Sequence, residues 1–173
     1  MRLGRRARYS VRLMMGIANL TLAGRPVSTK EIAKHSGISR RYLEQISCAL
    51  KNSALIKGHC GRGGGYTLGR PAAKIKIGEI ISAATGPVHI AECATDPASC
   101  VHADYCTCQL FWRLLDQQLN AVFNHFTLAD LIEDQGTQRL KGALAALDED
   151  STLSLDRPSP WFPKDNDCPR SRE

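Results

Sequence analysis

The chain has 173 residues, 43% of them apolar, which suffices for one compact domain with a core of mainly Leu, Ile, Ala and Val. No run of about 18 apolar residues occurs and the basic N-terminus lacks a cleavage site, so neither a membrane span nor a signal peptide is expected, and a cytoplasmic location is the default expectation. The net charge of +6 combines 15 Lys/Arg against 2 acids in residues 1–75 with 8 Lys/Arg against 15 acids in residues 76–173. This asymmetry indicates a module that binds a polyanion, joined to a second module, rather than a merely solvated basic surface.

The predicted elements begin with three helices. Apolar residues at helical spacing predict the first helix over residues 9–23. A hydroxyl residue then caps a short helix that contains residues 30–35, and Gly37 makes a turn. Ser39 starts a third helix over residues 39–53. This order and spacing predict a helix-turn-helix.

A small β-hairpin is predicted directly after the third helix, over residues 55–68, with a Gly-rich turn between its strands. A hairpin at this place is a wing. Residues 76–85 suit a fourth helix, and residues 109–126 have the strongest helical pattern in the chain, with an apolar stripe along one side. A short helix over residues 127–131 follows. The expected fold class is therefore mostly α with a small β-hairpin wing.

The predicted elements divide the chain into three regions. Residues 1–75 are expected to form a winged helix-turn-helix module, the candidate for DNA binding, and residues 76–134 a linker helix, a cysteine loop and the long dimerisation helix. Residues 135–173 form a C-terminal tail, in which residues 137–147 can extend as helix. Pro residues punctuate the polar stretch from about residue 150 onward, so the tail is expected to be largely disordered.

Polar side chains crowd the first turn and a half of the third helix, the end that enters the major groove in a helix-turn-helix. Arg can read guanine, Gln adenine and Glu cytosine, while hydroxyls near helix starts hold phosphates. An Arg in the wing can enter the minor groove. The candidate DNA-binding residues are Ser28, Thr29, Ser39, Arg40, Arg41, Tyr42, Glu44, Gln45 and Arg62. The alternative is a solvated helix face; a nucleotide site is disfavoured because the wing glycines lack P-loop spacing.

Clustered cysteines in a reducing compartment indicate metal or redox chemistry more often than disulfides. Cys93, Cys100 and Cys106 lie on one loop, separated by six and five residues, without the C-x2-C pair of a zinc knuckle. Thiolates suit zinc or an iron–sulfur cluster, and three reduced thiols without a ligand are the alternative. A thiol-redox enzyme using Cys106 or Cys108 with His102 lacks an orienting constellation, so no enzyme is expected. Scattered Cys48, in the third helix, is expected to be a small core residue.

Four motifs in this order resemble the Rrf2 family of bacterial transcription repressors, the group of IscR, NsrR and RirA. The motifs are RYSVRLMMGIANL, EIAKHSGISRRYLEQI, GRGGGYTLGRP and IKIGEIISAATGP. The cysteine loop followed by LFWR and TLADL continues the resemblance, which covers about residues 1–134.

The resemblance implies a homodimer on a palindromic double-stranded DNA operator, with residues 109–126 as the dimerisation helix. It also implies that Cys93, Cys100 and Cys106 hold a 2Fe–2S or 4Fe–4S cluster, which would report on cluster supply, iron, nitric oxide or redox state. By position, the same polar face of the third helix would meet DNA.

The sequence departs from the family at the fourth cluster ligand. Some members place a His three residues after the last cysteine, where this chain has Gln109, and others use an N-terminal acid of the partner, where this chain is basic. Cys108 is the first remaining candidate, and His102 and Asp104 are weaker ones. A zinc-binding or cluster-free winged-helix regulator therefore remains the alternative. Cys60 replaces the Arg that family wings often carry, so wing contacts are expected to depend on Arg62.

Overall fold

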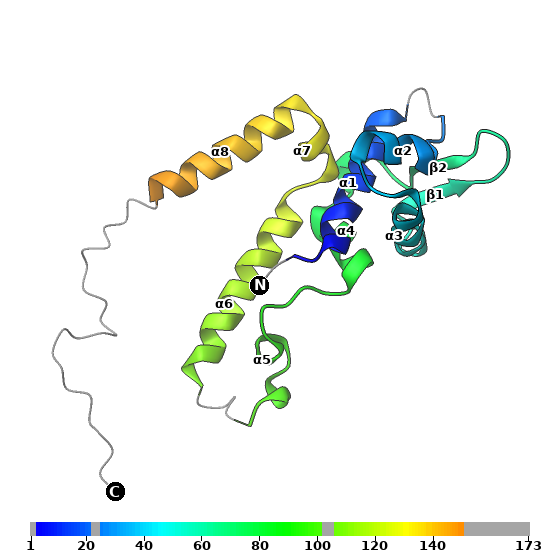
Figure 1. Cartoon of the computed structure of the whole chain (residues 1–173). Coiled ribbons are helices and arrows are strands. Elements are labelled where there is room, and N and C mark those ends of the chain that lie inside the picture. Colours follow the sequence, from blue (N-terminus) through cyan, green and yellow to red (C-terminus); the bar gives the residue numbers. More distant parts are fainter. Residues whose placement is uncertain (1–2, 22–24, 102–105, 151–173) are drawn as a thin grey trace, which may run out of the picture. The chain divides into compact units, whose positions relative to one another are not determined.

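The structure is a computed structural model that describes residues 3–21, 25–101 and 106–150 (Figure 1). The chain divides into two compact units, Met1–Thr137 and Gln138–Glu173. Residues 76–134, set apart on sequence grounds, lie in the same unit as the first 75 residues. The helices and strands in chain order are α1 (Arg5–Leu20), α2 (Thr29–Ser36), α3 (Arg40–Asn52), β1 (Ile56–His59), β2 (Gly65–Leu68), α4 (Ile77–Thr85), α5 (Glu92–Thr95), α6 (Thr107–His125), α7 (Leu128–Ile132) and α8 (Asp134–Asp150).

The core of the first unit forms around α1, which packs against α2, α3, α4 and α7. Its side chains Leu13, Met14 and Ile17 are completely buried, because they lie on the face of α1 that these helices surround. Predicted to begin at residue 9, the helix begins four residues earlier, at Arg5. Its first turn has three exposed arginines, Arg5, Arg6 and Arg8, and only the small Ala7 is buried, so the turn gives little apolar signal in the sequence.

The helix-turn-helix is formed by α2 and α3. Gly37 ends α2 with φ 68°, a left-handed conformation that favours glycine, so the chain turns there as predicted. Side chains three or four residues apart on α3, Leu43, Ile46 and Leu50, are buried as expected. Cys48 is exposed, and its assignment to the core was wrong, because position 48 falls on the opposite side of α3 from that stripe.

The wing is the antiparallel pair β1 and β2, in register from Ile56 opposite Leu68 to His59 opposite Gly65. Strand β2 also pairs with the segment before α2, since Val27 and Tyr66 exchange backbone hydrogen bonds of 2.9 and 2.8 Å. A Cβ on Gly65 would lie 2.3 Å from the Val27 carbonyl oxygen, so only glycine allows this approach. The wing is thereby fixed to the helix-turn-helix. The mostly α fold with a β-hairpin wing is confirmed.

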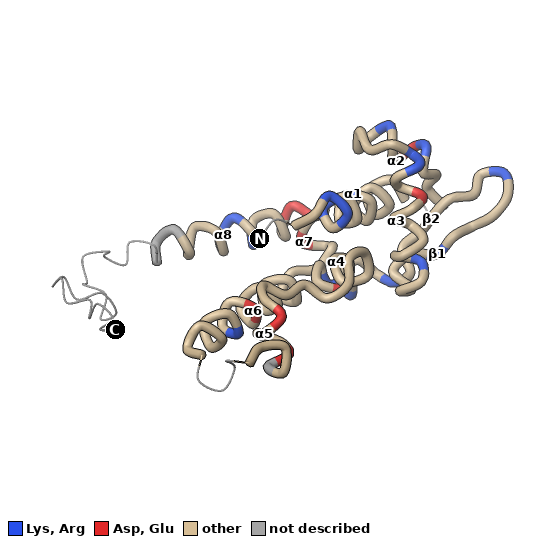
Figure 2. Tube along the Cα trace, turned by 60° about the horizontal axis from the view of Figure 1, so that its bottom comes forward, with Lys and Arg blue, Asp and Glu red and all other residues tan. Residues whose placement is uncertain are grey.

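Between α4 and α6, the chain is not a plain loop. It forms the short helix α5 and a 3-10 turn over Pro97–Ser99. Figures 1 and 2 both show α5 beside the first half of α6, and the two helices pack together. The Asn124 side-chain oxygen of α6 would lie 2.8 Å from a Cβ on Gly78, so α6 closely approaches α4 as well.

The last helix, α8, is longer than the expected 137–147 stretch and covers Asp134–Asp150. The helix expected over residues 137–147 is therefore present and extends further at both ends; residues 151–173, which hold most of the stretch expected to be disordered, lie outside the described residues. The Leu144 and Leu147 side chains of α8 are exposed. Among the described residues, no helix is long and apolar enough to cross a membrane.

Candidate nucleic-acid interface and cysteine site

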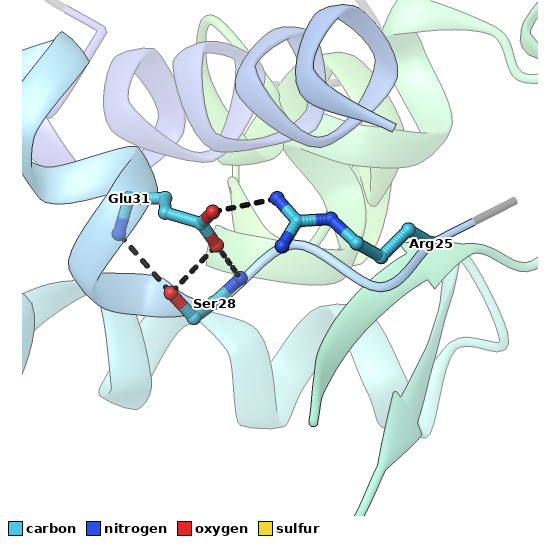
Figure 3. Close-up of polar contacts among 3 residues, drawn as sticks. All are labelled: Arg25, Ser28 and Glu31. Atoms are coloured by element: carbon cyan, nitrogen blue, oxygen red, sulfur yellow. Dashed lines mark hydrogen bonds and ion pairs between the residues drawn. The ribbon is translucent and has the colours of Figure 1, made fainter. Parts of the chain in front are cut away.

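The start of α2 is fixed by a reciprocal cap between Ser28 and Glu31 (Figure 3). The Ser28 hydroxyl accepts a hydrogen bond from the Glu31 N–H at 3.2 Å, and the Glu31 carboxylate accepts from the Ser28 N–H and hydroxyl at 2.9 and 2.8 Å. Arg25 adds an ion pair of 2.7 Å to the same carboxylate. The hydrogen bonds from the Ser28 backbone and side chain, then that from Arg25, lower the pKa of Glu31 from 4.5 to about 2. The cap therefore sets where the helix-turn-helix begins.

The exposed face of α3 contains most of the predicted DNA-reading residues. Ser39, Arg40, Arg41, Glu44 and Gln45 are exposed, and Tyr42 is half-buried, with its ring 5.7 Å from that of Tyr9 in an edge-on contact. The structure places this polar row opposite the buried stripe of α3. This is the arrangement of a recognition helix.

Thr29 and Arg40, two of the predicted DNA-binding residues, both hydrogen-bond to the carboxylate of Glu44. The Glu44 carboxylate accepts a 2.7 Å hydrogen bond from Arg40 and a 3.4 Å hydrogen bond from the hydroxyl of Thr29. Thr29 is a buried residue. Among the described residues, Arg41 and Gln45 make no side-chain hydrogen bond or ion pair. Arg41 and Gln45 are thus the side chains of α3 most available to base edges.

A basic groove of about 330 Å³ lies between the start of α2, α3 and the wing. Sequence reasoning proposed Ser28, Thr29 and Arg40 for this surface but missed Lys51 and His59, which line the groove too. Its lining residues are Ser28, Thr29, Arg40, Lys51, Gly58, His59, Cys60, Gly64, Gly65 and Tyr66. His59 reaches the groove on strand β1 of the wing, and Lys51 reaches it from the last turn of α3. No local pattern in the sequence indicates that these two residues meet the others. Cations and hydroxyls around a groove suit DNA phosphates.

Arg62 lies in the exposed turn of the wing, between Gly61 and Gly63, which have φ of 97° and 83°. Figure 2 shows Lys and Arg on the helix-turn-helix and at this turn, and acids on α5 and α6. The charge asymmetry of the sequence is thus also an asymmetry in space, with a basic surface on the predicted DNA-binding side.

The cysteines differ in exposure. Cys93, Cys100 and Cys106 are half-buried, whereas Cys48, Cys60 and Cys108 are exposed. Cys93 lies in α5, Cys100 follows the 3-10 turn, and Cys106 precedes α6. Cys108 lies in the first turn of α6. Two weaker candidates for a fourth ligand, His102 and Asp104, lie outside the described residues.

One residue connects two of these cysteines. The Gln109 N–H donates to the Cys106 carbonyl at 3.0 Å, and its side-chain amide donates to the Cys93 carbonyl at 2.9 Å. Gln109 is only 7% exposed. The structure thereby holds the backbones of Cys93 and Cys106 against one residue at the start of α6.

The donor set fits a thiolate-bound metal group in its chemistry, since three half-buried thiols lie on one segment of chain. The start of α6 also favours negative charge, as found on thiolates. Within residues 3–21, 25–101 and 106–150, however, no three Cys, His, Asp or Glu side chains are gathered closely enough to hold a metal ion. The three thiols are therefore close in sequence, but the described residues do not bring them together into a coordination site.

A helix-turn-helix with a wing and a basic face defines a winged-helix DNA-binding regulator. Residues 3–134 match the model of the Rrf2 family, described as an iron-dependent transcriptional regulator. The match spans most of the chain, in the region where the sequence motifs resemble this family. The chain belongs to the Rrf2 family.

Relatives support this membership over nearly the whole chain. The HTH-type transcriptional regulator IscR of Escherichia coli strain K12 is 35% identical over 156 residues, which cover 90% of this chain and 95% of the relative. Among solved structures, CymR, the global cysteine regulator of B. subtilis, is 30% identical with a TM-score of 0.61, covering 76% of this chain and 96% of CymR. IscR of T. potens is 28% identical with a TM-score of 0.63, covering 78% and 88%. The family model and the E. coli relative are both described as transcriptional regulators, so this chain is a DNA-binding transcriptional regulator and not an enzyme.

Proposed function

We propose that this chain is an iron–sulfur-cluster-dependent repressor that binds a palindromic DNA operator as a homodimer. Cys93, Cys100 and Cys106 are the proposed cluster ligands. Cys108 is the first candidate for a fourth ligand and His102 the second. The signal is the presence or state of the cluster, which responds to cluster supply, iron, nitric oxide or redox state.

The observation that carries this proposal is the arrangement of the three loop thiols. They are the half-buried cysteines among those described, and two of them, Cys93 and Cys106, are linked through Gln109. A bound cluster supplies a redox-active centre that is lost when iron is scarce or when oxidants attack it. When thiols on α5 and at the start of α6 bind the same cluster, the cluster ties these two elements together.

The DNA-contacting residues are proposed to act at two kinds of site. Arg41 and Gln45 read base edges in the major groove, and Arg62 of the wing enters the minor groove. Lys51, with the hydroxyls and cations of the basic groove, holds the phosphates. Contacts to phosphate set affinity, and contacts to bases set the sequence that is bound.

The proposed homodimer rests on an exposed apolar face of α6. Leu110, Phe111, Leu114 and Val122 are 61, 54, 53 and 53% exposed, and all lie on the side of α6 away from its buried residues. A soluble protein seldom leaves such a face open to water. A second copy of the same helix can cover it in a symmetric contact, which would also place two recognition helices on one operator.

The proposal is tested on anaerobically purified protein by visible absorption with iron and sulfide analysis, before and after reconstitution. We expect a brown protein with equal iron and sulfide, and a Cys93→Ala variant that is colourless but unfolds at the same temperature as cluster-free wild type. Cys48→Ala, which removes an exposed thiol outside the loop, should keep the colour. Operator affinity, measured with and without the cluster, should differ for wild type and Cys48→Ala but not for Cys93→Ala.

Two results would contradict cluster dependence. A colourless wild type that contains zinc would be a zinc-stabilised regulator. A colourless wild type without metal, even after reconstitution, would be a cluster-free regulator whose signal lies elsewhere. A coloured Cys93→Ala variant that still switches would remove Cys93 from the ligand set.

A further inference from the structure

Two buried polar side chains of α6 face the segment that carries Cys93. Gln109 and Asp116 are 7% and 8% exposed, and seven residues, or about two helical turns, separate them on one side of the helix. Polar groups that are buried this well are stable only when they are hydrogen-bonded. Both find their partners in residues 89–93.

Gln109 supplies the contact nearest to the thiols. Its side-chain amide donates to the Cys93 carbonyl at 2.9 Å, while its own N–H, in the first turn of α6, donates to the Cys106 carbonyl at 3.0 Å. The amide nitrogen that makes the first bond has no lone pair to offer a metal. The Gln109 side chain thus acts on the backbone of Cys93, while its N–H makes a first-turn backbone bond to Cys106.

Asp116 fixes the same segment two turns further along α6. Its Oδ1 accepts from the Ile90 N–H at 3.1 Å, and its Oδ2 accepts from the Asn120 amide at 3.1 Å and lies 3.5 Å from His89 Nδ1. Asn120 also donates to the Asp116 carbonyl at 2.9 Å. The carboxylate therefore joins the chain just before α5 to the middle of α6.

We propose that Gln109 and Asp116 are positioning residues that lock the Cys93 segment to α6, so that ligand binding at the thiols and the placement of α6 are coupled. That the group bound at the thiols is an iron–sulfur cluster rests on the proposed function. The lock itself consists of contacts within this chain. Movement of the Cys93 backbone must either carry α6 with it or break these partly buried hydrogen bonds.

The lock is tested without any cluster by amide hydrogen exchange on the cluster-free full-length protein. We expect Asp116→Ala to speed exchange at the Ile90 amide about tenfold or more, because a partly buried hydrogen bond to a carboxylate is lost. Gln109→Ala should likewise speed exchange at the Asp96 amide, which closes α5 by its bond to the Glu92 carbonyl. Gln117→Ala, which removes an exposed Gln from the same helix, should change neither. Wild-type exchange rates in the Asp116 and Gln109 variants would overturn the lock.

The coupling to the thiols is tested by the rate at which a chelator bleaches the reconstituted protein. Gln109→Ala and Gln109→Leu should both lose colour about tenfold faster than wild type, while Gln117→Ala follows wild type. The Leu variant keeps the volume of Gln but cannot donate a hydrogen bond. A Leu variant that bleaches as slowly as wild type would therefore show that Gln109 only fills space.

If wild type takes up no cluster, the proposed function fails, while the exchange experiment still decides whether the lock exists. If wild type is coloured and bleaching is unaltered in both Gln109 variants, the coupling fails and the proposed function stands.

Discussion

At the scale of single residues, neighbouring arginines at the start of α3 have different surroundings. Arg40 is bound to Glu44 at 2.7 Å, whereas Arg41 has no hydrogen-bond or ion-pair partner within the described residues. An unengaged guanidinium on a recognition helix can form a bidentate contact with guanine without first breaking a bond. We therefore expect Arg41→Ala to weaken operator binding by about 1–3 kcal/mol and to relax the preference at one base pair.

The measurement is operator binding at one salt concentration for the consensus site and for sites changed at each base pair, and over a range of salt concentrations for the consensus site. Lys34→Ala serves as the control, since it removes an exposed cation of α2 from the same module. A cation that only holds phosphate would weaken all sites equally and lower the salt dependence. An Arg41→Ala variant with that uniform behaviour would assign Arg41 to the phosphate backbone instead of a base.

At the scale of elements, α2 depends on an ionised cap. Because the pKa of Glu31 is lowered from 4.5 to about 2, its carboxylate stabilises the folded state above pH 4.5, and this contribution is lost as the pH falls toward 2. The urea midpoint of wild type should therefore exceed that of Glu31→Gln near neutral pH, and the two should converge in acid. Urea unfolding followed by circular dichroism across this range checks the expectation.

Glu133→Gln is the matched control for the cap. It removes an exposed carboxylate whose side chain makes no hydrogen bond within the described part of the chain. This variant should follow wild type at every pH. A gap between wild type and Glu31→Gln that stays constant down to the lowest pH would mean that the charge of Glu31 does not stabilise α2.

The elements also differ in how well the sequence predicts them. The helix-turn-helix and the wing could be predicted because their signals are local: a cap at Ser28, a turn at Gly37 and glycines between two short strands. The apolar stripe of α6 was correctly recognised as one face of a helix. However, periodicity does not tell which face of a helix points into its own chain, and in α6 the buried side presents Gln109 and Asp116.

The candidate site was predictable in its residue types but not in its contacts. The spacing of Cys93, Cys100 and Cys106 singled them out, and the structure separates them from the exposed thiols. The lock on Cys93 depends on residues 16 or more positions away in the sequence, and the contribution of His59 to the basic groove depends on the wing folding back. Such contacts arise from tertiary packing, which a single sequence encodes without a local pattern.

At the scale of the whole molecule, the exposed apolar face of α6 is the proposed dimer interface. Leu114 is 53% exposed in the single chain, so a charge there should leave the fold of one chain intact. In a dimer whose interface includes this face, Leu114→Glu removes about 1.5–3 kcal/mol of burial from each copy and adds a desolvated charge. We expect the dimer dissociation constant to rise by about a hundredfold or more, measured by sedimentation velocity over a range of concentrations.

Leu144→Glu in α8 makes this test specific, because Leu144 is 62% exposed and receives the same substitution. If α6 forms the interface, Leu144→Glu stays dimeric while Leu114→Glu becomes monomeric at the same concentration. The monomer should then bind a half-site with wild-type strength but lose affinity for the full operator, because one recognition helix no longer positions the second. A Leu114→Glu variant that remains dimeric, with Leu144→Glu monomeric, would move the interface from α6 to α8. Two dimeric variants would show that neither apolar face holds the copies together.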